Sequence, residues 1–166
     1  TEFELRRDKD VNRPGDWLSV FMNEIACADR VLVVLSEEYL KSRYCMRELL
    51  HLYQNSNNSR FEFMNKIIPV HDGSLQISSA LERMQYARHW KNYHTKLEQA
   101  IQDIGAAAAG DAARAELLLV MDFMHHTNDL LYWVSDTIMP RSSAGIDAAI
   151  ELFRDRKSTR LNSSHL

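Results

Sequence analysis

Residues 31–50, VLVVLSEEYLKSRYCMRELL, decide the fold of this chain. The first five are apolar without alternation, which is typical of a strand covered on both faces in a parallel sheet. Apolar side chains then recur at helical spacing around Met46 to Tyr53. A strand followed closely by a helix predicts a repeating unit of an α/β fold.

The segments on either side extend this pattern. Phe3 and Leu5 alternate with charged residues as in a half-buried strand, and a helix is predicted over residues 17–28, after a polar loop. Ile67-Ile-Pro-Val70 is a further apolar strand, whose proline indicates an edge or strand-end position. The order predicts a doubly wound, flavodoxin-like parallel sheet flanked by helices.

Beyond about residue 90 the pattern is helical only. Apolar side chains step by three and four along two segments that residues 105–110 join, which predicts an antiparallel helical hairpin over residues 91–140. Pro140 is expected to end its second helix, and Ile146 to Phe153 to begin another. The apolar seams suit packing within the chain or, alternatively, a coiled-coil partner.

Composition narrows the class of protein. With 45% hydrophobic and 26% charged residues, the chain has the usage of an ordinary globular domain. No apolar run approaches the roughly 18 residues that span a bilayer. Cys27 and Cys45 are too few for a disulfide framework, and the histidines lack metal-ligand spacing. These features predict a cytoplasmic protein without a membrane segment or a metal.

Both ends of the chain call for separate interpretation. The sequence starts with Thr1 rather than with methionine, and its first residues do not have the pattern of a signal peptide, so it is expected to begin inside a domain. Residues 155–166 look like the translation of a sequencing-adapter oligonucleotide, the alternative being a genuine polar tail. Their basic side chains are therefore no signal for nucleic-acid binding.

Three segments carry a resemblance to a known family: Arg7-Asp8 with Pro14-Gly-Asp16, then residues 28–36, then Ser36-x-x-Tyr-Leu-x-Ser-x-Tyr-Cys-x-x-Glu-Leu49. In this order they resemble the Toll/interleukin-1 receptor (TIR) domain, most closely its bacterial members. The resemblance implies a partial TIR domain over residues 1–90 that lacks its first strand. The hairpin (91–140), a linker with a truncated helix (141–154) and the artefactual tail (155–166) would follow it.

The resemblance also implies an activity. In enzymatic TIR domains, the glutamate of the Cys-x-x-Glu segment is the catalytic carboxylate that cleaves the nicotinamide bond of NAD, and Glu48 matches it. A carboxylate can stabilise the oxocarbenium character that develops on the ribose. Helical geometry sets Glu48 at the flank of an apolar arc, with Arg47 and His51 facing away. The alternative is an ordinary solvated helix residue.

Further residues are expected to bind NAD, which is the substrate rather than a cofactor. Tyr44 takes the place where the family usually has Trp, and could stack on a ring of the nucleotide. Cys45 is either a reactive thiol or a small buried side chain. Ser36 and Ser42 are strand-end and helix-capping groups that could also touch substrate.

The loop from Arg7 to Asp16 carries charges of both signs. Its counterpart in the family mediates contacts between domains, so it implies self-association or docking with other TIR domains; Arg7 and Asp8 could instead meet NAD, or the loop could be merely solvated. Two functions remain open: an NAD nucleosidase switched on by self-association in bacterial defence or stress, or a non-catalytic adaptor. Without its first strand, the chain as given is expected to be unstable and inactive.

Overall fold

The computed structural model describes residues 28–140, 144–145 and 147–151. The strand predicted at Phe3 and Leu5, the loop Arg7 to Asp16 and the tail 155–166 lie outside the described residues. The helix predicted over residues 17–28 also lies outside them, except for its last residue.

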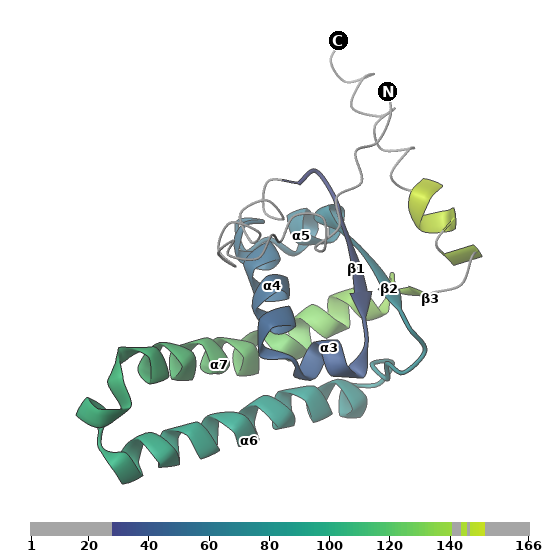
Figure 1. The fold of residues 1–166 in the computed structure, drawn as a ribbon. Helices are drawn as coiled ribbons and strands as arrows, with labels where there is room; N and C mark the ends of the chain where they lie inside the picture. Colours follow the sequence, from purple (N-terminus) through teal and green to yellow (C-terminus); the bar gives the residue numbers. More distant parts are fainter. Residues whose placement is uncertain (1–27, 141–143, 146, 152–166) are drawn as a thin grey trace, which may run out of the picture.

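A parallel sheet forms the centre of the described structure (Figure 1). Its strands are β1 (Val31–Leu35), β2 (Ile67–His71) and β3 (Met139–Pro140), hydrogen-bonded in that order, with both neighbouring pairs parallel. The two apolar strands expected from the sequence are thus confirmed. The chain has the predicted α/β fold, with a small parallel sheet and helices around it.

The strand positions correct one expectation. β2 is the middle strand of this sheet and Pro69 lies inside it, so the edge or strand-end position inferred from the proline is wrong. β3 pairs only with Val70 and His71, and Pro69 lies just before that pairing. A proline is tolerated there because, among the described residues, β3 does not pair with that position.

The two faces of β1 differ in burial, which corrects a second expectation. Val33 and Leu35 are 5% and 0% exposed, whereas Leu32 and Val34 are 39% and 38% exposed. The continuous apolar run therefore does not mark a strand buried on both faces. Side chains alternate across a strand, and only the face of Val33 and Leu35 packs into the core.

Two helices follow β1 and meet at a sharp corner. Helix α3 (Glu37–Lys41) is capped by Ser36, and α4 (Arg43–Gln54) is capped by Ser42. The helix predicted around Met46 to Tyr53 is confirmed and begins earlier. Helix α3 was not expected, although its start carries a signal. A serine can cap a helix, and two glutamates in the first turn interact favourably with the positive end of the helix dipole.

Serine caps also begin the next helices. Ser59 caps α5 (Arg60–Lys66), and Ser79 forms a capping box with Glu82 at the start of α6 (Ala80–Ile104). Both starts have the Ser-x-x-Glu spacing, in which the serine hydroxyl accepts a backbone N–H bond that the helix cannot satisfy. The long helices therefore begin at residue 80, before the hairpin boundary expected at residue 91.

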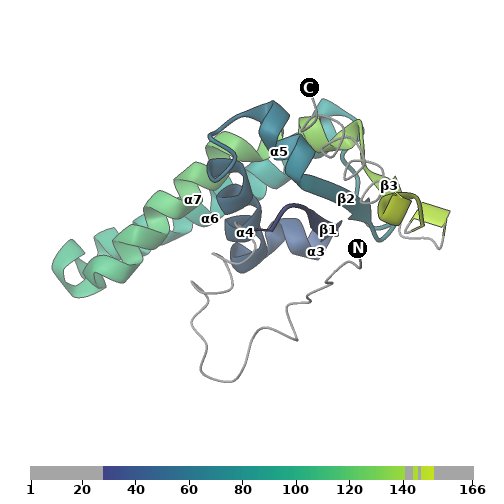
Figure 2. The same cartoon turned by 90° about the horizontal axis from the view of Figure 1, so that it is seen from above.

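The helical hairpin itself is confirmed. Helix α6 and α7 (Ala106–Ser135) run side by side in opposite directions, and Figure 2 shows them reaching well beyond α3 and α4. Gly105, with φ +85°, joins them, and Gly110 introduces a kink. The expectation that Pro140 ends the second helix is wrong, because α7 ends at Ser135 and Pro140 belongs to β3.

One apolar core connects the sheet, the corner and the hairpin. Leu35, Leu40, Leu49, Trp90 and Phe123 belong to it, and each is at most 1% exposed. The hairpin seam thus packs within the chain, and the boundary expected at residue 90 falls inside α6. A helix was expected from Ile146 to Phe153, and the described residues 144–145 and 147–151 are helical; Ala149 packs on Ile68 and Val70.

A membrane-spanning segment was sought among the helices of the described ranges, and none of them is both long and apolar enough.

Candidate functional site

The site predicted from the sequence lies at the corner between α3 and α4. Ser36 Oγ accepts a hydrogen bond from the N–H of Tyr39 at 2.9 Å, and Ser42 Oγ accepts one from the N–H of Cys45 at 3.5 Å. The capping role expected of both serines is confirmed. These bonds fix the first turn of each helix, and contact with a substrate stays a prediction.

Glu48 lies at the border of the buried face of α4. It is half-buried, while the side chains that fill the core are Met46, Leu49, Leu50, Leu52 and Tyr53. This is the flank position expected from helical geometry. Arg47 is exposed as expected, but the expectation that His51 also faces away is wrong, because His51 is half-buried with its Nε2 enclosed.

The carboxylate of Glu48 acts on two neighbouring groups. Burial and then the charge of Glu48, followed by Cys45, raise the pKa of Tyr39 well above its usual value. Burial raises the pKa of the Cys45 thiol; the Ser42 hydroxyl partly offsets this, and Glu48 adds to it. We call Tyr39, Ser42, Cys45 and Glu48 the carboxylate cluster.

The chemistry of the carboxylate cluster follows from these shifts. A raised pKa keeps Cys45 as a thiol at neutral pH, so the structure favours the small packed side chain over the reactive thiolate. Tyr39 likewise stays a neutral phenol. The cluster therefore sets one carboxylate beside two uncharged, polarisable side chains, where low solvent exposure strengthens its electric field.

Tyr44 presents its ring to solvent one helical turn before Glu48. The residue is 58% exposed, and the guanidinium of Arg43 lies 5.6 Å from the ring centroid. An exposed aromatic ring with a cation at one side is suited to stacking on a planar ligand. Of the predicted binding residues, Tyr44, Cys45 and Ser42 thus share the first turn of α4, while Arg7 and Asp8 lie outside the described residues.

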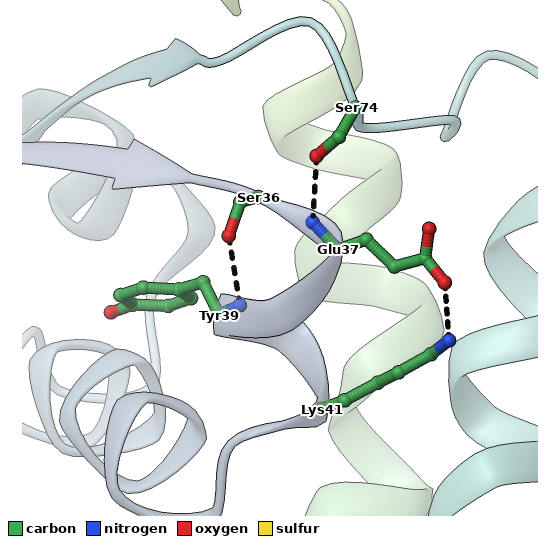
Figure 3. A network of polar contacts seen from close by, with 5 residues as sticks. All are labelled: Ser36, Glu37, Tyr39, Lys41 and Ser74. Atoms are coloured by element: carbon green, nitrogen blue, oxygen red, sulfur yellow. Dashed lines mark hydrogen bonds and ion pairs between the residues drawn. The ribbon is translucent and has the colours of Figure 1, made fainter.

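A separate polar hollow lies at the carboxyl ends of β1 and β2, which we call the strand-end groove. It has a volume of about 340 Å³, and its lining includes Glu37, Lys41, Ser74, Gln85, Arg88 and His89. Glu37 donates its N–H to Ser74 Oγ at 3.2 Å and accepts a bond from the ammonium of Lys41. Figure 3 shows the Tyr39 ring pointing away from these groups, on the other side of α3.

None of the described residues predicted as site residues lines the strand-end groove. Its charges are largely paired: Lys41 bonds Glu37, and burial followed by the charge of Lys41 lowers the pKa of His89. The groove therefore combines neutral and paired polar groups with the guanidinium of Arg88. A neighbouring hollow shares Glu37 and Lys41 with it and reaches Asp72.

The sequence-based prediction missed two contributors to the corner. Tyr39 stands inside the motif as the tyrosine of Ser-x-x-Tyr, and its place next to the cysteine segment was the available signal. Glu116 bonds both Arg43 and the hydroxyl of Tyr93. No local pattern marks Glu116, because it lies 73 residues from Arg43 along the chain.

A metal centre was also sought. In the part of the chain that the structure describes, no group of three or more His, Cys, Asp or Glu side chains could hold a metal ion.

Comparisons with known proteins agree with the resemblance carried by the motif. Searches among curated proteins and among solved structures give no match. A family model described as TIR domain matches residues 3–104, which include β1, β2, the α3–α4 corner and all of α6. Because this match covers more than half of the chain, the protein belongs to the TIR-domain family.

Proposed function

We propose that this member of a signalling-domain family is a cytoplasmic NAD nucleosidase of a bacterial defence or stress response, active after self-association. Glu48 is its essential carboxylate. The observation that carries the proposal is the setting of Glu48 in the carboxylate cluster, half-buried and close enough to raise the pKa of both Tyr39 and Cys45. Residues with strongly shifted pKa values gather at functional sites, and Tyr39 and Cys45 are two such residues beside Glu48.

The reaction needs little from the protein besides a placed negative charge. The bond between ribose C1′ and the nicotinamide nitrogen breaks, and its electron pair leaves with neutral nicotinamide. Positive charge then develops on the ribose, where Glu48 stabilises it. Water adds to C1′ and loses a proton, which leaves ADP-ribose.

The neighbours of Glu48 suit this task. Cys45 and Tyr39 stay uncharged at neutral pH, so neither adds a charge of its own beside the carboxylate. Tyr44 supplies an exposed ring for stacking on a base of NAD, and Ser42 holds the helix turn that carries it. Arg7 and Asp8 are assigned to the remainder of the dinucleotide or to the contact between subunits.

A non-catalytic adaptor is the second candidate. Neither the strand-end groove nor its neighbouring hollow touches Glu48, which favours a protein that works through surface contacts alone. In that case the segment Arg7 to Asp16 would dock onto a second TIR domain, and Glu48 would contribute nothing beyond helix solvation.

Nicotinamide release separates the two candidates. The longest form of the protein that its gene encodes is incubated with NAD over a range of protein concentrations. We expect turnover per molecule to rise with concentration, and Glu48→Ala to lower it about 100-fold or more. Glu38→Ala, an exposed acid on α3, is the matched control. No release at high protein concentration, or an unaffected Glu48→Ala variant, would support the adaptor.

A further inference from the structure

The helical hairpin touches the α3–α4 corner at two points. The buried indole N–H of Trp90 donates to the carbonyl oxygen of Leu40 at 3.1 Å, near the end of α3. On the other side of the corner, Glu116 of α7 bonds Arg43, the first residue of α4. The turn that precedes Glu48 is therefore held from outside its own helix.

The Glu116 carboxylate uses a different oxygen for each partner. Oε2 accepts from the guanidinium of Arg43, and Oε1 accepts from the hydroxyl of Tyr93 on α6. The Tyr93 hydrogen bond and then the Arg43 contacts lower the pKa of Glu116 despite partial burial. Glu116 is thus ionised at neutral pH, and its carboxylate connects both helices of the hairpin to α4 through charge-assisted hydrogen bonds.

The same arginine continues the connection to Tyr44. Its guanidinium lies 5.6 Å from the centroid of the Tyr44 ring. A continuous chain of contacts therefore runs from Tyr93 through Glu116 and Arg43 to Tyr44. Glu48 follows Tyr44 by one turn of α4, about 6 Å along a rigid helix.

The first turn of α4 adjoins the corner and precedes the buried residues of the helix, which begin at Met46. Helix α3 has 5 residues, and the single residue Ser42, with φ −84° and ψ +126°, separates it from α4. The Ser42 cap orders the backbone of the first turn of α4, but the side chains of Arg43 and Tyr44 in this turn do not belong to the core, so contacts from elsewhere set their positions. Glu116 supplies such a contact through its bond with Arg43.

We propose that Glu116 is a positioning residue that sets Glu48 by holding Arg43 and Tyr44 in the first turn of α4. This role rests on the proposed nucleosidase function. The hairpin thereby becomes part of the catalytic arrangement, and a partner that moves α6 against α7 would change the placement of Glu48.

The first test is kinetic and uses the full protein with NAD. Glu116→Gln keeps the shape of the side chain and removes its charge, while Tyr93→Phe removes one hydrogen bond. We expect Glu116→Gln to lower kcat about tenfold and Tyr93→Phe to lower it less, since a shifted carboxylate fails mainly in the transition state.

Asp111→Asn is the matched control for this test. Asp111 lies on the same helix and pairs with Arg114 at 3.5 Å, but it is fully exposed and its partner belongs to the hairpin. Its kcat should equal that of the parent. An unchanged kcat in Glu116→Gln, or an equal loss in Asp111→Asn, would overturn the proposal.

The second test does not depend on activity. Hydrogen exchange of the amides in residues 43–48 should accelerate about tenfold in Glu116→Gln and stay unchanged in Asp111→Asn. Unchanged exchange in Glu116→Gln would overturn the positioning role even if kcat fell. If exchange accelerates while the parent protein releases no nicotinamide, the proposed function and the positioning role fail together, and only the contact between hairpin and corner stands.

Discussion

The carboxylate cluster and the strand-end groove lie on opposite sides of α3, and they treat their charges differently. In the cluster, burial and, after it, the charge of Glu48 raise the pKa of two half-buried neighbours, Tyr39 and Cys45. In the groove, Glu37 is exposed and bonded to Lys41, four residues on. The carboxylate of the cluster thus lies beside two neutral side chains, whereas the carboxylate of the groove is bonded to a lysine; after burial, Glu37 contributes to the raised pKa of Tyr86 and Lys41 to the lowered pKa of His89.

This difference teaches that a hollow and a reactive group need not coincide. The groove has a volume of about 340 Å³, but the carboxylate that lines it, Glu37, is paired with Lys41 of the same helix. The cluster holds the carboxylate of Glu48, and the exposed ring of Tyr44 lies one helical turn before it. The proposed function therefore rests on the side of α3 that carries Glu48 and not on the side that carries the hollow.

The largest effect should come from Trp90, which supports both sides at once. Its ring packs on Phe123 and on His89 of the groove, and its indole N–H bonds Leu40. Trp90→Ala should lower the free energy of unfolding by about 3–5 kcal/mol, because it leaves a cavity and an unpaired carbonyl. Urea denaturation measures this loss.

Leu81→Ala is the control for Trp90→Ala. Leu81 lies on the same helix and is 77% exposed, so its loss should change the free energy of unfolding by less than about 0.5 kcal/mol. If both variants unfold at the same urea concentration, Trp90 does not join the two sides.

A smaller effect is expected on the alkylation rate of the Cys45 thiol, which should respond to a change in the cluster but not to one in the groove. In a Cys27→Ser background, alkylation of Cys45 should be slow at neutral pH and accelerate only at alkaline pH, because burial and Glu48 raise its pKa. Removing a negative charge favours the thiolate, so Glu48→Gln should lower that pKa and speed alkylation at pH 8.

Glu37→Gln provides the comparison from the other side of α3. It removes the same charge from the groove and should leave the pH profile of Cys45 alkylation unchanged. Equal shifts in the two variants would show that the sides are not electrostatically distinct.

The smallest effect should come from the ion pair of the groove. Lys41→Ala removes an exposed pair at i, i+4, whose side chains are 42% and 50% exposed, and should cost about 0.3–0.5 kcal/mol of unfolding free energy. The difference should disappear in concentrated salt. A loss several times larger, unaffected by salt, would mean that the pair supports the fold.

The sequence predicted the elements whose signal is local. Apolar runs and helical spacing located β1, β2, α4 and the hairpin, and the motif located Glu48 at the flank of its helix. Serine caps also announce α5 and α6, since Ser59 and Ser79 each precede a glutamate by three residues.

Features that depend on distant partners were beyond the sequence. The apolar side chains of β1 do not tell which face is covered, so Leu32 and Val34 were wrongly expected to be buried. The two residues of β3 pair with β2 only after the whole hairpin, which is why Pro140 was taken for a helix end. The bond between Glu116 and Arg43 likewise joins segments without a shared pattern.

The most direct test compares two single substitutions on either side of α3. Nicotinamide release from NAD is measured for the full protein and for its Glu48→Gln and Glu37→Gln variants, at equal concentration and folded fraction. We predict that Glu48→Gln loses at least about 100-fold in kcat, while Glu37→Gln keeps the activity of the parent. Equal activity in the Glu48→Gln variant and the parent would contradict the assignment of Glu48 as the catalytic carboxylate.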